Sequence, residues 1–68
     1  MSLTITLNGE PRRIADGETI AGLVRAIGLD PAKVAVERNL EIVPRSTLAE
    51  VVLAGGDTLE IVHFVGGG

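Results

Sequence analysis

The sequence predicts a two-layer α+β domain in which one main helix packs on one face of a mixed, four- to five-stranded sheet. Residues 3–7, Leu-Thr-Ile-Thr-Leu, alternate apolar and polar side chains, as a half-buried strand does. Residues 20–27 carry apolar side chains at the i, i+3, i+4 and i+7 positions of a helix that packs on a sheet. Residues 58–65, Thr-Leu-Glu-Ile-Val-His-Phe-Val, form a second apolar strand. The 68 residues are enough for one small domain.

The order of the strands follows from the turns between them. Asn8-Gly9 is the preferred pair for a two-residue type I′ turn, which predicts a hairpin with residues 10–14 as the return strand. Pro11 cannot donate to a ladder, so we expect this return strand at the edge of the sheet. Gly55-Gly56-Asp57 predicts a turn into the final strand. That strand is expected beside the first and parallel to it, because the intervening chain is long enough for the crossover.

The predicted helix has signals at both ends. Thr19 is placed to cap its N-terminus, and Gly28 stands where a glycine that ends a helix belongs. Asp30-Pro31 has the pattern of a second cap with proline at the first helical position. We therefore expect a second helical segment of at most one turn directly after the main helix.

Two short strands and a further turn fill the second half of the chain. Residues 34–38 and 41–43 are predicted strands, and Pro44 ends the second one. Ser46 is expected to cap a short helical segment over residues 46–52. The sequence contains no internal repeat and no linker.

The composition excludes several classes of function. The net charge is −3 and the six basic residues are scattered, which argues against a nucleic-acid partner. The chain has no cysteine and one histidine, so neither a disulfide framework nor a zinc site of the usual kind is expected. No apolar run approaches 18 residues and the start lacks the pattern of a signal peptide, so we expect a cytoplasmic protein without a membrane partner.

The side chains give little indication of enzyme chemistry. The carboxylates are spread over turns and strand faces, and the serines lack a supporting histidine and aspartate. His63 is in register with Leu59 and Ile61 on the final strand. We therefore expect a partly buried histidine at the end of the sheet.

Gly66, Gly67 and Gly68 follow the apolar final strand and close the sequence. Because glycine loses more backbone freedom on ordering than other residues, we expect a domain over 1–65 and a mobile tail over 66–68. Such a tail is a slim thread with an α-carboxylate that is ionised at neutral pH. A narrow enzyme tunnel would admit this thread, while the alternative is a frayed end or an expression remnant.

The final strand also predicts a docking surface beside the tail. Counting with period two places Leu59 and Ile61 on the side of the helix and leaves the intervening residues on the open face. An exposed aromatic residue beside a reactive terminus is typical of a docking patch. The predicted docking residues are Val62, Phe64 and Val65. The alternative for Phe64 is that strand twist places its ring over the end of the sheet as a cap on the core.

The whole chain resembles the ThiS-type sulfur carriers of thiamine biosynthesis, a ubiquitin-like β-grasp family. The stretches that carry the resemblance, in the expected order, are Asn8-Gly9, residues 34–39, residues 42–45, Gly56-Asp57 and the terminal glycines. A terminal glycine pair is common to ubiquitin-like modifiers. The Asn-x-x-Ile-Val-Pro-Arg stretch at residues 39–45 points to this family in particular.

The resemblance implies a protein co-substrate that is not itself an enzyme and holds no cofactor. A ThiF-type adenylating enzyme would use ATP and magnesium to adenylate the carboxylate of Gly68. A donor that carries a persulfide would then supply sulfur, AMP would leave, and the resulting thiocarboxylate would deliver its sulfur to thiazole synthase. Gly66 and Gly67 would extend the carboxylate away from the domain and into the site of a partner. The free protein is expected to be a monomer.

Two alternatives remain open from the sequence. The small subunit of molybdopterin synthase has the same fold, tail and activation chemistry, but it serves a different acceptor. A ubiquitin-like binding module with an inert tail would keep the fold without the chemistry.

Overall fold

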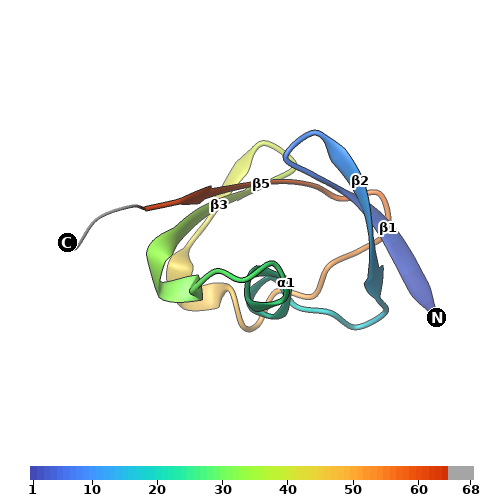
Figure 1. The fold of residues 1–68 in the computed structure, drawn as a ribbon, viewed down its shortest axis with the longest axis horizontal. Helices are drawn as coiled ribbons and strands as arrows, with labels where there is room; N and C mark the ends of the chain where they lie inside the picture. Colours follow the sequence, from blue (N-terminus) through green and yellow to red (C-terminus); the bar gives the residue numbers. More distant parts are fainter. Residues whose placement is uncertain (65–68) are drawn as a thin grey trace.

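A five-stranded mixed sheet with one α-helix beneath it makes up the protein in the computed structural model, which describes residues 1–64 (Figure 1). In chain order, the elements are β1 (Ser2–Leu7), β2 (Glu10–Ala15), α1 (Ile20–Ala26), the 3₁₀ helix η1 (Pro31–Lys33), β3 (Val34–Arg38), β4 (Glu41–Val43), the 3₁₀ helix η2 (Arg45–Thr47) and β5 (Thr58–His63). The strands lie in the order β2-β1-β5-β3-β4. Helix α1 covers one face of the sheet, and the other face is open (Figure 1). The predicted fold class is confirmed.

The first hairpin forms as the sequence predicts. Asn8 and Gly9 have φ angles of 50° and 85°, and the type I′ turn requires positive values at both central positions. Strand β2 pairs antiparallel with β1 and lies at the edge of the sheet. Pro11 is tolerated there because an edge strand has no second neighbour to which its missing N–H would donate.

The last strand of the chain is central in the sheet. Strand β5 runs parallel to β1, with Thr58 opposite Thr6 and Leu59 opposite Leu7. On its other side β5 pairs antiparallel with β3. The predicted parallel pairing of the first and last strands is therefore confirmed, and β5 joins the β1–β2 hairpin to the β3–β4 hairpin.

Helix α1 and the turn after it have the caps that the sequence predicts. The Thr19 hydroxyl accepts a hydrogen bond from the backbone N–H of Gly22 at 3.0 Å. Gly28 has a φ of 87°, the left-handed conformation that commonly ends a helix. The Asp30 carboxylate accepts from the N–H of Ala32 at 2.9 Å, which caps η1.

The helical segment expected after Ser46 is shorter than predicted, and Ser46 does not cap it. Helix η2 covers only residues 45–47, and Pro44 occupies the capping position without a side-chain hydrogen bond. The Thr47 hydroxyl instead donates to the carbonyl oxygen of Pro44 at 2.8 Å. The backbone after η2 pairs with the start of α1: the carbonyl oxygens of Leu48 and Val51 accept from the N–H groups of Ala21 and Ile20, and Val52 forms a bridge with Thr19.

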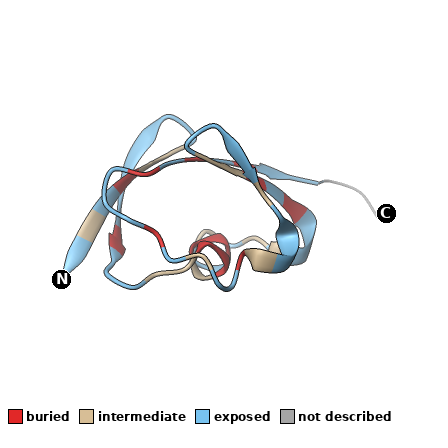
Figure 2. Cartoon of the chain, turned by 180° about the vertical axis from the view of Figure 1, so that it is seen from behind, coloured by how far each residue is buried: buried red, intermediate tan, exposed pale blue. Residues whose placement is uncertain are grey.

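The core lies between the sheet and α1 and is entirely aliphatic (Figure 2). Its buried members are Ile5, Ile14, Ile20, Ala21, Leu23, Val24, Val34, Val36, Leu48, Leu53, Leu59 and Ile61. Leu59 and Ile61 come from β5, so removing this strand would open the core as well as the sheet. Within residues 1–64, no helix is long and apolar enough to cross a membrane.

Candidate functional site

The candidate site is the C-terminal end of β5, where the chain leaves the sheet. Val62 is 59% exposed on the open face, and Phe64 is 48% exposed directly after the strand. These two of the three predicted docking residues are therefore accessible, and Phe64 is not part of the buried core. The third predicted docking residue, Val65, and the tail residues 66–68 lie outside the described residues.

Phe64 is held by its backbone and by its ring. Its N–H donates to the carbonyl oxygen of Lys33 at 2.9 Å, which extends the contact between β5 and the start of β3 by one residue. The guanidinium of Arg45 lies over the ring at 5.5 Å from the centroid, the geometry of a cation–π interaction. The Nε–H of Arg45 also donates to the carbonyl oxygen of Val34 at 3.4 Å. Arg45 therefore connects the ring of Phe64 to the backbone of β3.

The start of β5 is fixed by a buried carboxylate. Asp57 is 6% exposed and stands directly before the strand. Its Oδ2 accepts hydrogen bonds from Nε of Arg38 and from the backbone N–H of Ala54, each at 2.9 Å. Nη2 of the same arginine forms a salt bridge with Oδ2, also at 2.9 Å. Its Oδ1 accepts from the amide of Asn39 at 3.1 Å. Both oxygens of this carboxylate accept hydrogen bonds, which offsets the free-energy cost of burying its charge.

These contacts also set the charge of Asp57. Burial alone raises the pKa of its carboxyl, because a less polar environment disfavours the ionised form. The hydrogen bonds from the Ala54 N–H, Asn39 and Arg38, together with the positive charge of Arg38, outweigh burial and hold the pKa below its ordinary value of 3.8. Asp57 is therefore ionised at neutral pH.

Asn39 joins the β3–β4 turn to the first residue of β5. Its side-chain oxygen accepts from the N–H of Thr58 at 2.9 Å, and its own N–H donates to the carbonyl oxygen of Thr58 at 2.7 Å. Asn39 and Leu40 have positive φ angles of 52° and 71°, which turns the chain tightly from β3 into β4. Asparagine tolerates this conformation better than most residues.

The middle of β5 is held by the side chain of Asn8. Strand β1 ends at Leu7, and the Asn8 amide then takes the place of a strand backbone. Its oxygen accepts from the N–H of Ile61 at 2.8 Å, and its nitrogen donates to the carbonyl oxygen of Ile61 at 3.3 Å. Strand β5 is thus bonded at its start, its middle and its end.

His63 differs from the prediction, because its side chain is exposed. It occupies the last paired position of β5, opposite Val34. The period-two pattern gave the side of the sheet, which His63 shares with its partner Val34, but it did not give the extent to which neighbouring elements cover the last residue of the strand.

Sequence reasoning missed the residues that anchor β5. Asp57, Asn8 and Asn39 were predicted as turn residues and Arg38 as a strand residue, and these four and Arg45 belong to the stretches that carry the family resemblance. Their contacts with β5 and Phe64 were not predicted. No local signal in the sequence indicates these contacts, because they join residues that are far apart in the chain.

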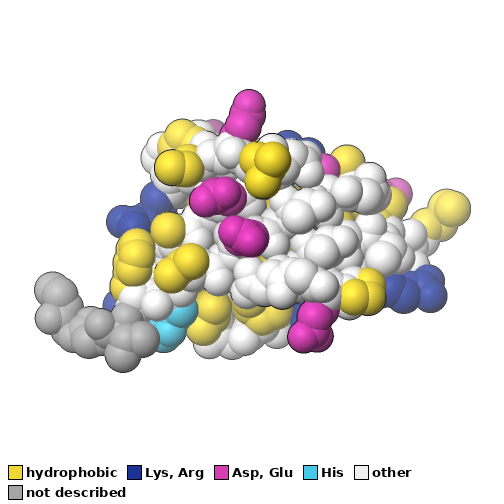
Figure 3. All heavy atoms as spheres, turned by 90° about the horizontal axis from the view of Figure 1, so that it is seen from above, with side chains coloured by type: hydrophobic (Ala, Val, Ile, Leu, Met, Phe, Trp, Pro, Cys, Tyr) yellow, Lys and Arg dark blue, Asp and Glu magenta, His cyan; other side chains and the backbone are white. Residues whose placement is uncertain are grey.

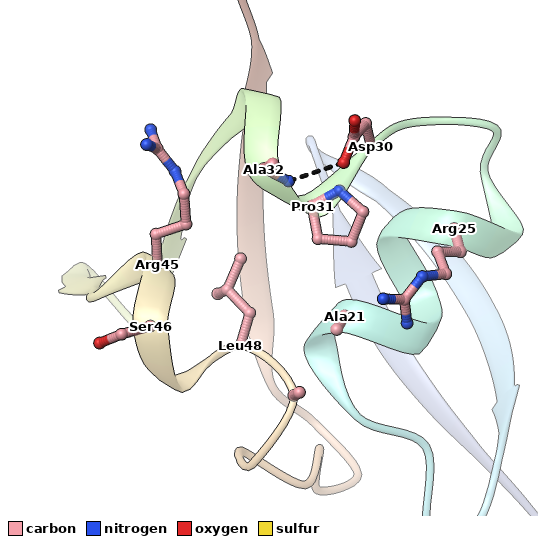
Figure 4. Close-up of a pocket in the computed structure, with 9 residues that line it drawn as sticks. Ala21, Arg25, Asp30, Pro31, Ala32, Arg45, Ser46 and Leu48 are labelled. Carbon is pink, nitrogen blue, oxygen red and sulfur yellow. Dashed lines mark hydrogen bonds between the residues drawn. The ribbon is translucent and has the colours of Figure 1, made fainter.

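A hollow of about 330 Å³ lies between α1, η1 and η2, on the helix side of the sheet (Figure 4). The Asp30 carboxylate at its rim already caps η1, and the guanidinium of Arg45 points away from Leu48 (Figure 4). No group of His, Cys, Asp and Glu within residues 1–64 is arranged to hold a metal ion. The hollow therefore has no constellation of metal ligands in the described part of the chain.

The sequence is similar to proteins of thiamine biosynthesis. The model of the ThiS family matches residues 5–68. The chain is 50% identical over 66 residues to part of a thiazole synthase of Paramagnetospirillum magneticum, and equally to part of one from Magnetococcus marinus. These matches cover 97% of this chain, which spans only 20% of the length of either relative. The sulfur carrier protein ThiS of Bacillus subtilis is 47% identical over 53 residues, covering 78% of this chain and 80% of that protein.

Solved structures agree with this result. The crystal structure of the thiamine biosynthesis protein ThiS from Geobacter metallireducens matches with a TM-score of 0.79 and 29% identity, over 97% of this chain and 100% of the other. A designed protein based on a ubiquitin template matches with a TM-score of 0.53 and 19% identity, which shows the ubiquitin-like β-grasp fold alone. The family match over nearly the whole length and the structural agreement lead to one conclusion: this chain belongs to the ThiS family.

Proposed function

We propose that this chain is a sulfur carrier of thiamine biosynthesis that acts as a protein co-substrate. The family match over residues 5–68 is the observation that carries the proposal. The contacts around β5 support it, because a strand that is bonded at its start, middle and end presents the residues after Phe64 from a fixed point.

The proposed chemistry takes place on the carboxylate of Gly68. A carboxylate is a poor acyl donor because oxide is a poor leaving group. Attack of the carboxylate on the α-phosphorus of ATP releases pyrophosphate and forms a mixed anhydride with AMP, which is a good acyl donor. The terminal sulfur of a persulfide then attacks the carbonyl carbon and AMP leaves. A thiol reductant cleaves the remaining S–S bond to give the thiocarboxylate.

The ATP and magnesium belong to a ThiF-type adenylating enzyme in this proposal, and the carrier itself holds no cofactor. Thiazole synthase is the proposed acceptor, because two proteins of that name contain a segment 50% identical to this chain. Val62 and Phe64, with Val65, are the proposed contacts with these enzymes, and the cytoplasm is the proposed location. None of the named relatives favours a role in molybdopterin synthase.

The intact mass of the protein tests the proposal. The chain is incubated with a purified ThiF-type adenylating enzyme, ATP, magnesium, a persulfide donor and a thiol reductant. We expect the mass to rise by the difference between one sulfur and one oxygen. An unchanged mass, with an adenylating enzyme that activates a known ThiS protein, would refute the proposed function.

Two control variants locate the reaction. One lacks Gly68, and the other carries one additional residue after Gly68. Both are expected to fold as the wild type does and to gain no sulfur. If the extended variant gains sulfur without being trimmed, Gly68 is not the modified residue.

A further inference from the structure

The open face of the sheet carries a small apolar hollow over β3, β4 and β5. Ile42 is 80% exposed and Val62 is 59% exposed, although both are large aliphatic residues. The hollow measures about 120 Å³, and its lining residues are Ala35, Val36, Glu37, Ile42, Glu60 and Val62. Figure 3 views this face and shows acidic side chains close together near its middle, with hydrophobic side chains beside them. The hollow is therefore lined by two glutamates and by apolar side chains.

Two carboxylates of this hollow face each other across neighbouring strands. The register of β3 and β5 places Glu37 directly opposite Glu60, and the register of β3 and β4 places Ile42 on the other side of Glu37. Like charges that are directly opposite in a sheet destabilise it. Within residues 1–64, the only ion pair joins Arg38 to Asp57, so no described basic side chain neutralises either glutamate.

No basic side chain lines the hollow, and the arginines at the end of β3 and at the start of η2 make contacts elsewhere in the chain. Arg38 is bound to Asp57, and Arg45 lies over Phe64. The cation that would complement the two glutamates must therefore come from outside the described residues. The position of the hollow is informative, because Glu60 and Val62 belong to the strand that leads directly to Phe64 and the tail.

We propose that this hollow receives an arginine or lysine side chain, flanked by apolar residues, from the adenylating enzyme that activates the tail. The cationic group would lie between Glu37 and Glu60, while its aliphatic stem and the apolar neighbours pack on Ile42 and Val62. Arginine fits best, since its planar fork can bind two carboxylates while its stem covers apolar surface. The inference rests on the proposed function and adds the chemistry of the partner surface.

The inference predicts that stability and binding respond in opposite directions. Neutralising one of the two glutamates removes a repulsion within the sheet, so the melting temperature stays equal or rises. The same substitution removes part of the site for the partner's cation, so the affinity for the enzyme falls. A residue that only supports the fold would not produce this combination.

The variants for the test are Glu37→Gln, Glu60→Gln and the double variant, and Glu10→Gln is the matched control. Glu10 is an exposed glutamate of β2, the edge strand on the far side of β1. Its substitution therefore changes the net charge as much as either single substitution does, and it leaves the hollow unchanged. The binding of each protein to the purified adenylating enzyme is measured by titration calorimetry, and its melting temperature by circular dichroism. We expect the double variant to bind about tenfold more weakly or worse, and Glu10→Gln to bind as the wild type does.

A charge reversal sharpens the test. Glu60→Lys places an opposite charge beside Glu37, which is expected to raise the melting temperature while it weakens enzyme binding further than Glu60→Gln does. The salt dependence of binding should also decrease in the double variant, because one charge contact is lost. A folded double variant that binds as tightly as the wild type would overturn the inference, and so would an equal loss of affinity in Glu10→Gln.

The outcome of this test is separable from that of the proposed function. If the wild-type chain is not adenylated by an active enzyme, the proposed function fails. If the wild type is adenylated and the double variant binds and reacts at the same rate, only the role of this hollow is refuted.

Discussion

Replacing Asp57 by asparagine is expected to destabilise the fold more than any other change of a single polar group described above. Asparagine keeps the shape of the side chain but has one acceptor oxygen and one donor nitrogen in place of two acceptors. If the nitrogen takes the position of Oδ2, it faces the donors of Arg38 and Ala54; if it takes the position of Oδ1, it faces the amide of Asn39. Either orientation leaves buried donors without an acceptor.

The magnitude follows from the number and type of these contacts. A hydrogen bond that involves a charged group contributes about 1.5–3 kcal/mol, and breaking a buried ion pair costs about 3–5 kcal/mol. The side chain of Arg38 is 30% exposed, so we take the low end of this range, about 3 kcal/mol. A domain of this size has a total stability of roughly 3–10 kcal/mol, so Asp57→Asn removes a large part of it. The melting temperature should fall by roughly 12–24 °C, at about 4–8 °C per kcal/mol.

The dependence on pH gives an independent check. The pKa of Asp57 in the folded state lies below its ordinary value of 3.8, so its carboxylate contributes stability at every pH above that value. This contribution is lost as the pH falls below 3.8 and through the folded-state pKa. The difference in stability between wild type and Asp57→Asn should therefore be constant from neutral pH down to about pH 5 and shrink below pH 3.8.

The assay is urea denaturation followed by circular dichroism, because the chain has no tryptophan or tyrosine for fluorescence. Asp16→Asn is the matched control, since Asp16 is an exposed aspartate in the turn after β2. A loss of less than about 1 kcal/mol for Asp57→Asn would be no more than a surface-type effect and would refute the reasoning. A difference in stability that stays constant below pH 3 would show that the charge of Asp57 is not the cause.

Three further outcomes are expected. Phe64→Glu should melt near the wild-type temperature, because the ring is outside the core, and it should bind the adenylating enzyme or thiazole synthase more weakly. Full affinity in the folded variant, or a large drop in melting temperature, would exclude Phe64 as a docking residue. Gly67→Ala should fold normally and be adenylated more slowly, because the added methyl widens the thread beside the reacting carbonyl, and unchanged activation kinetics would contradict this. Arg45→Ala should cost about 0.5–1 kcal/mol more in wild type than in a Phe64→Leu background, where only the hydrogen bond to Val34 is lost. Equal costs in both backgrounds, measured as a double-mutant cycle by urea denaturation, would show that the two residues do not interact.

The local signals of the sequence were sufficient for the elements of the fold. The alternation in β1, the Asn8-Gly9 turn, the Thr19 cap and the apolar stripe of α1 depend on residues a few positions apart, and the structure has each of them. The central position of β5 was also predictable, because Pro11 leaves β1 without a second neighbour on the β2 side and the chain offers one strong apolar strand to fill the place.

The interactions that fix the candidate site depend on pairings between distant residues. Asp57 contacts Arg38 and Asn39 only because β5 inserts beside β3, and nothing in the neighbourhood of Asp57 in the sequence indicates this. The juxtaposition of Glu37 and Glu60 likewise requires the register of two strands. Ser46 was assigned a cap because serine often has that role, but Pro44 occupies the capping position, and the backbone that follows η2 pairs with the distant start of α1.

The late position of β5 in the sequence has a consequence for how the molecule is recognised. Until β5 inserts, the β1–β2 hairpin and the β3–β4 hairpin have no strand in common, and the core lacks Leu59 and Ile61. During synthesis, contacts between β1 and β5 can form only after the residues up to and including β5 have left the ribosome. The open face over β3, β4 and β5 does not exist in a partly folded chain. An enzyme that binds this face therefore selects molecules that have finished folding, and it does not bind unfolded chains that carry the same glycines.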